Sequence, residues 1–155
     1  MTNDYHNNTD AVSTPPHAFT MTYEQRLDLE DRLVEVVCDV IDRDMGDISW
    51  PGPTCRLMEL AWAMSRLHRI IDHATGRPMT MQHLATRLCK KLGRRLPTNI
   101  YSVARQSLLS GRPSVIDCFG SLWYESGIDP KALLLETGAK DSAKHDLTTL
   151  SRSAS

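Results

Sequence analysis

Apolar residues recur at three- and four-residue spacing through most of this chain, in segments that Gly and Pro separate from one another. This spacing places them along one face of an α-helix. Runs that alternate apolar and polar residues and are rich in β-branched side chains, as strands require, are missing. The pattern therefore predicts an all-α fold, a compact bundle of five or six helices.

Capping residues and breaks set the predicted helix boundaries. Thr22 and Gln25 form a capping box that opens a helix expected to reach about Asp44. A Trp-Pro-Gly-Pro break at 50–53 separates it from the next helix. The later helices are predicted at 54–73, 81–92, 99–110, 114–127 and 129–137. Helical periodicity predicts as core residues Leu60, Met64, Leu84, Leu88, Ile100, Val103, Phe119 and Trp123.

The 155 residues are enough for one domain, which we place at 20–138. Residues 1–19 are rich in Asn, Thr, Ser and Pro and are predicted to be a disordered N-terminal arm, and residues 139–155 a disordered C-terminal tail. The N-terminus lacks the pattern of a signal peptide, and no apolar run approaches the roughly 18 residues that span a membrane. The four cysteines include no C-x-x-C pair, which fits reduced thiols. These features predict a cytoplasmic protein without membrane contact.

Charge is distributed very unevenly along the chain. The stretch from His73 to Ile116 holds eight basic and no acidic residues, whereas residues 1–72 hold six basic and thirteen acidic ones. The net charge of −1 hides this separation, which can mark a site for a polyanion. A pI near 6.6 argues against a protein that coats nucleic acid generally, so any such binding is expected to be local to the basic stretch.

A basic helical hairpin is predicted at 80–111, and we expect nucleic acid to bind there. Arg and Lys reach phosphates, whereas Asn, Gln and Arg can bond base edges in the major groove of duplex DNA. Across roughly 80–110 the pattern resembles a helix-turn-helix in broad outline, although its six-residue turn is longer than the usual three or four. The predicted function is that of a small nucleic-acid-associated regulatory protein. Its candidate phosphate contacts are Arg87, Lys90, Lys91, Arg94 and Arg95, and its candidate base contacts are Asn99, Ser102, Arg105 and Gln106.

Two other roles for the basic residues stay open at this point. They can dock an acidic protein partner, which makes the chain a non-enzymatic interaction module. They can also be neutralised within the molecule by the acidic face of the first helix, through surface ion pairs worth about 0–1 kcal/mol each. Of the aromatic residues only Tyr101 falls inside the basic helical segment, so the sequence favours groove or backbone contact over stacking on single strands.

Enzymatic chemistry has no support in the sequence. The motifs G-x-S-x-G, G-x-G-x-x-G and G-x-x-x-x-G-K-[ST] are absent, and so are H-E-x-x-H and any His pair at i, i+4. His68 and His73 are five residues apart and diverge on a helix. We therefore expect no catalytic residue, no metal site, no cofactor and no small-molecule substrate.

Overall fold

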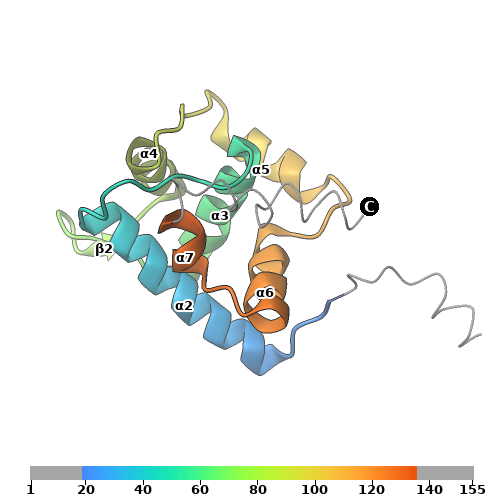
Figure 1. Ribbon diagram of the computed structural model, residues 1–155. Coiled ribbons are helices and arrows are strands. Elements are labelled where there is room, and N and C mark those ends of the chain that lie inside the picture. Colours follow the sequence, from blue (N-terminus) through green and yellow to red (C-terminus); the bar gives the residue numbers. More distant parts are fainter. Residues whose placement is uncertain (1–18, 136–155) are drawn as a thin grey trace, which may run out of the picture.

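The computed structural model describes residues 19–135, which form six helices and one two-stranded antiparallel sheet (Figure 1). The predicted all-α bundle is confirmed. All but one residue of the predicted arm, and the whole of the predicted tail at 139–155, lie outside the described residues. The elements are α2 (Tyr23–Asp42), α3 (Thr54–Leu67), β1 (Ile71–Asp72), β2 (Arg77–Pro78), α4 (Met81–Lys91), α5 (Ile100–Leu108), α6 (Val115–Ser126) and α7 (Pro130–Leu135).

Side-chain caps fix the starts of four helices. Thr22 Oγ1 accepts a hydrogen bond from the Gln25 N–H at 3.0 Å, and the Gln25 side chain accepts one from the Thr22 N–H. This completes the predicted capping box of α2. The side chains of Thr80, Asn99 and Ser114 each accept from the N–H three residues on and cap α4, α5 and α6. Each of these helices begins at the residue after its cap.

The central helix is α3, which packs against α4, α5 and α6 (Figure 1). The long α2 packs against α4, α6 and α7. Two of the eight predicted core residues, Val103 and Trp123, are only half-buried against this core. The other six are buried as predicted: Leu60, Met64, Leu84, Leu88, Ile100 and Phe119.

The second predicted helix is too long, because α3 ends at Leu67 rather than His73. His68 adopts the left-handed conformation with φ of 56°, which stops the helix. The chain then forms a short hairpin in which β1 pairs with β2, a feature that sequence analysis missed. The hairpin closes onto the core because Ile70 and Met79 are both buried, and the Met79 N–H donates to the Ile70 carbonyl at 2.7 Å. Each strand has two residues, which is too few to show in the sequence the alternation of apolar and polar side chains that marks a strand.

The segment before α2 packs on α6. The ring of Phe19, which was assigned to the disordered arm, stacks on Tyr124 with centroids 6.4 Å apart. Gly120 makes room for this segment, since a Cβ there would lie 2.6 Å from the Met21 sulfur. The Tyr124 hydroxyl donates to the Gln25 carbonyl at 2.7 Å, and burial raises the pKa of this phenol. The ordered domain therefore begins at least as early as residue 19.

Candidate functional site

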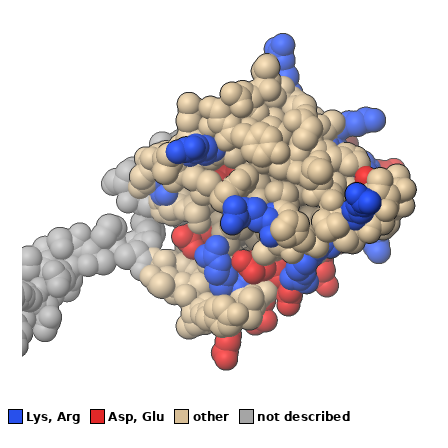
Figure 2. Space-filling view, turned by 180° about the vertical axis from the view of Figure 1, so that it is seen from behind, with Lys and Arg blue, Asp and Glu red and all other residues tan. Residues whose placement is uncertain are grey.

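Acidic and basic side chains are unevenly distributed on the surface. Figure 2 shows most of the visible Asp and Glu in the lower part of one face, with Lys and Arg among them, and further Lys and Arg across the rest of the face. The acidic side chains of α2 are partly neutralised by neighbours: Asp31 lies 2.6 Å from Arg69, and Asp39 lies 3.4 Å from Lys131. Both of these cations come from outside the basic stretch. From the basic stretch itself, Arg87 pairs with Asp42 at 3.7 Å, so the predicted neutralisation of that stretch by the first helix is found at this pair.

Two of the predicted phosphate contacts instead bind the end of α2. Arg87 Nη2 donates to the Ile41 carbonyl and lies 3.7 Å from the Asp42 carboxylate. Lys91 Nζ donates to the Arg43 carbonyl at 3.1 Å. The last turn of α2 has no basic residue of its own. The cations from α4 donate hydrogen bonds to its last carbonyl groups and interact favourably with the negative end of the helix dipole. Arg87 and Lys91 therefore have structural roles.

Arg94 is likewise engaged within the fold. Its guanidinium donates to Thr54 Oγ1 at 3.1 Å, to the Trp50 carbonyl at 3.0 Å and to the Gly52 carbonyl. A planar guanidinium suits such a set of converging acceptors. Arg94 thus holds the loop before α3 in place.

The other six predicted contact residues have fewer internal partners. The Asn99 side chain is used in capping α5, where it accepts from the Ser102 N–H at 3.3 Å, and Ser102 is half-buried. Within residues 19–135, none of the remaining basic residues of this set forms an ion pair. The exposed members are Lys90, Arg95, Asn99, Arg105 and Gln106.

The packing of α4 and α5 differs from that of a helix-turn-helix. In that motif two helices pack on each other across a tight turn. Here residues 92–99 connect them, and both pack mainly on α3 rather than on one another. The two helices of the predicted basic hairpin therefore pack separately on α3 and do not form a hairpin with each other.

A groove lined by two aromatic rings lies on the α3–α5 side of the molecule. It consists of hollows of about 670 Å³ and 390 Å³ that share Trp62 and Tyr101. Arg66 and Arg77 line the larger hollow and Arg105 the smaller one, and no Asp or Glu of residues 19–135 lines either. We call these five residues the aromatic groove.

Each ring of the aromatic groove has an arginine one helical turn later. Arg66 follows Trp62 on α3 and places its guanidinium 4.7 Å from the indole centroid, a cation–π contact. Arg105 follows Tyr101 on α5, and the Tyr101 ring is 56% exposed. Residues four apart lie on one helix face, so each aromatic–x-x-x–Arg pattern was visible in the sequence. The sequence did not show that Trp62 and Tyr101 line the same space. Sequence analysis therefore missed Trp62, Arg66 and Arg77 as site residues.

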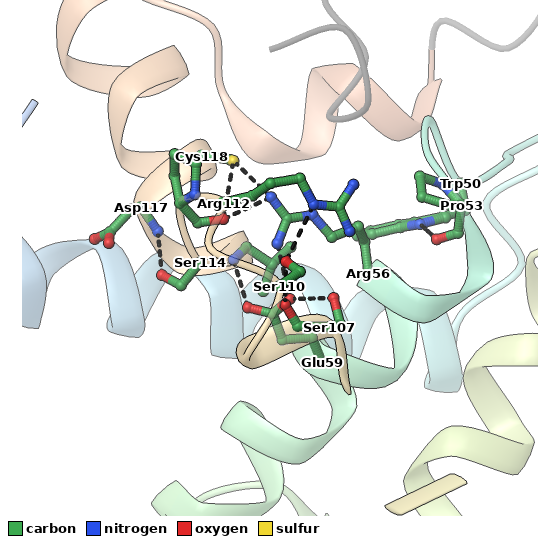
Figure 3. A network of polar contacts seen from close by, with 12 residues as sticks. Trp50, Pro53, Arg56, Glu59, Ser107, Ser110, Arg112, Ser114, Asp117 and Cys118 are labelled. Carbon is green, nitrogen blue, oxygen red and sulfur yellow. Dashed lines mark hydrogen bonds and ion pairs between the residues drawn. The ribbon is translucent and has the colours of Figure 1, made fainter. Parts of the chain in front are cut away.

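A buried polar network holds α5 and α6 against α3 (Figure 3). Arg56 and Glu59 of α3 are 0% and 1% exposed, and their charged groups lie 2.8 Å apart. The Glu59 carboxylate also accepts from Ser107 Oγ of α5 and from the Val115 N–H that opens α6, both at 2.7 Å. This network fixes the helix that carries Tyr101 relative to the helix that carries Trp62.

Arg56 completes this network toward α6. Its Nη2 donates to the Pro113 carbonyl at 2.6 Å and to Cys118 Sγ at 3.3 Å. Because Arg56 and Glu59 are closed off from solvent, they are placed to stabilise packing rather than to meet a substrate.

Two of the four cysteines, Cys38 and Cys89, have thiol pKa values raised by their surroundings. Burial raises the pKa of the Cys89 thiol, and burial together with Asp42 and Asp39 raises that of Cys38. A raised pKa keeps a thiol protonated and weakly nucleophilic at neutral pH. Within residues 19–135, no group of three His, Cys, Asp or Glu is placed to hold a metal ion. No helix in that range has the length and apolar character needed to cross a bilayer.

No family model, curated protein or solved structure matches the chain. The functional argument therefore rests on the chemistry of the aromatic groove.

Proposed function

We propose that the protein is a small, non-enzymatic nucleic-acid-binding regulator and that the aromatic groove is its main contact surface. The observation that carries this proposal is the lining, in which the described part of the chain places three arginines and two aromatic rings but no Asp or Glu. Guanidinium groups bind phosphates, and aromatic rings accept bases. Carboxylates would repel the same ligand, so their absence from the lining is part of the argument.

The electrostatic state of these arginines supports the proposal. Arg66, Arg77 and Arg105 form no ion pair with any residue between 19 and 135. Their charge is therefore available to a polyanion, in contrast to that of Arg87. A positively charged concave surface concentrates phosphate-bearing ligands from solution.

The contact surface in this proposal differs from the one predicted from the sequence. Arg87, Lys91 and Arg94 serve the fold. Lys90 and Arg95 are exposed and supply further phosphate contacts. Arg105 keeps its predicted place in the binding surface, but beside a tyrosine ring instead of on a helix that reads the major groove.

An acidic protein is the second candidate partner, because apolar side chains are exposed at the end of α5. Leu109 is 72% exposed and directly follows Leu108, which lines the smaller hollow. Aromatic residues and Arg are enriched at protein interfaces, and Lys is depleted. Such a partner would present carboxylates to Arg105 and an apolar side chain to Leu109.

The experiment that tests the proposal is fluorescence anisotropy with labelled oligonucleotides between about 50 and 200 mM salt, since each phosphate contact contributes about −0.7 to −0.9 to the slope of log K against log salt. Changing Arg66, Arg77 and Arg105 together to Gln is expected to reduce that slope by about two to three. Arg43→Gln is the matched control, because this arginine is 74% exposed at the end of α2. A folded protein that binds no oligonucleotide at low salt would overturn the proposal and favour the acidic protein.

A further inference from the structure

The aromatic groove combines aromatic rings with arginine side chains, and Ser65, His68 and Thr80 add polar groups to the larger hollow. More than half of the Tyr101 side chain is exposed to solvent. The Arg66 guanidinium lies 4.7 Å from the centroid of the Trp62 ring and adds a planar cation beside it. Flat aromatic and guanidinium surfaces are what unpaired bases stack on.

A duplex cannot use such surfaces. Paired bases in a duplex stack on one another, and only their edges are accessible in the grooves. A base must therefore leave the duplex, or be single-stranded from the start, before its face can contact Tyr101. The larger hollow is about 670 Å³, within the roughly 300–1,000 Å³ of small-ligand pockets.

The remaining lining fits a strand that carries both bases and phosphates. Met79 and Met81 are buried and give the larger hollow apolar contacts. Arg77 and Arg105 line different hollows, so a strand passing both rings meets a cation in each. Because bases and phosphates alternate along a single strand, such a strand can present bases to the rings and phosphates to these cations.

We infer that the aromatic groove takes single-stranded nucleic acid, with unpaired bases stacked on Tyr101 and on the Arg66–Trp62 pair. This inference rests on the proposed function and specifies its ligand. It differs from the duplex DNA expected from the sequence, because Trp62 and Tyr101 come together only in the folded chain.

Three probes of equal length test the inference in one binding assay: a single-stranded oligonucleotide, the same strand with abasic sites throughout, and a duplex. The abasic strand keeps the phosphates and loses the bases. We expect the base-bearing single strand to bind most tightly, and the abasic strand to bind roughly 5- to 150-fold more weakly for each stacked base lost. Tryptophan fluorescence should be quenched by the base-bearing strand and not by the abasic one.

Variants at Tyr101 separate stacking from charge. Tyr101→Ala is expected to lower affinity for the base-bearing strand by the same roughly 5- to 150-fold and to leave the abasic strand unaffected. Tyr101→Phe keeps the ring and should retain binding. Tyr23→Ala is the matched control, because this tyrosine is 76% exposed on α2.

The outcomes distinguish this inference from the proposed function. If none of the three probes binds, both are overturned. If the abasic strand or the duplex binds as tightly as the base-bearing strand and Tyr101→Ala has no effect, nucleic-acid binding stands and the single-strand inference fails.

Discussion

Replacing Glu59 with Leu tests whether the buried network holds the helices of the aromatic groove in place. The change removes the carboxylate that accepts from Arg56, Ser107 and the Val115 N–H. It leaves the Arg56 guanidinium, 0% exposed, buried without that counter-charge. Removing one partner of a buried ion pair costs about 3–5 kcal/mol. This is a large share of the roughly 5–15 kcal/mol by which small domains are stable.

A second substitution in the same pair should recover part of that loss. When Arg56→Met accompanies Glu59→Leu, no charge is left in the core, and such apolar replacements are often neutral or stabilising by about 1–4 kcal/mol relative to the intact pair. Ser107 Oγ and the Val115 N–H lose the Glu59 carboxylate in both variants, at about 1–3 kcal/mol each, so this loss does not distinguish them. The double variant should therefore be more stable than Glu59→Leu alone.

Urea unfolding followed by circular dichroism measures these differences. Glu35→Leu is the control, because Glu35 pairs with Arg32 at the same i, i+3 spacing but is 67% exposed, and its loss should cost no more than about 1 kcal/mol. The reasoning is refuted if Glu59→Leu lowers the free energy of unfolding by no more than Glu35→Leu does, with the slope of that free energy against urea concentration unchanged. It is equally refuted if Arg56→Met adds to the loss instead of reducing it.

Three further substitutions test other parts of the fold by the same measurement. Arg94→Met should cost about 1.5–3 kcal/mol because it removes charged hydrogen bonds to the loop before α3. The control, Lys90→Ala at an exposed position, should change the free energy of unfolding by less than about 0.5 kcal/mol. Equal effects of the two substitutions would contradict the structural role of Arg94. Gly120→Val should cost about 1–3 kcal/mol and release Met21 from α6, and an unchanged free energy of unfolding would contradict that contact. Leu88→Ala should cost about 2–5 kcal/mol, since this side chain is 1% exposed, and a loss below 1 kcal/mol would place it outside the core.

Features encoded by neighbouring residues were predictable from the sequence. The starts of α2, α4 and α6 follow from Thr22, Thr80 and Ser114, each of which meets an N–H only three residues away. The end of α6 follows from Gly127, which has a positive φ of 69°. Interactions of this range require no knowledge of the tertiary fold.

Features that depend on distant residues were not predictable in the same way. Arg56–Glu59 and Arg32–Glu35 are both Arg–Glu pairs at i, i+3, yet the first is buried and the second exposed. Only the packing of α5 and α6 on α3 makes this difference. The use of Arg87 and Lys91 at the end of α2, and the meeting of Trp62 with Tyr101, depend on tertiary packing in the same sense.

The Glu59 carboxylate also has a consequence for how the molecule opens. It joins three helices through one group, because it lies on α3 and accepts from Ser107 of α5 and from the first N–H of α6. Detaching either helix alone would remove one of these hydrogen bonds while the Glu59 carboxylate stays largely buried on α3, so such half-open states are disfavoured. The slowest amide protons of α3, α5 and α6 should therefore exchange with solvent in a single cooperative event, as one foldon, while those of the short β1–β2 hairpin exchange independently and faster.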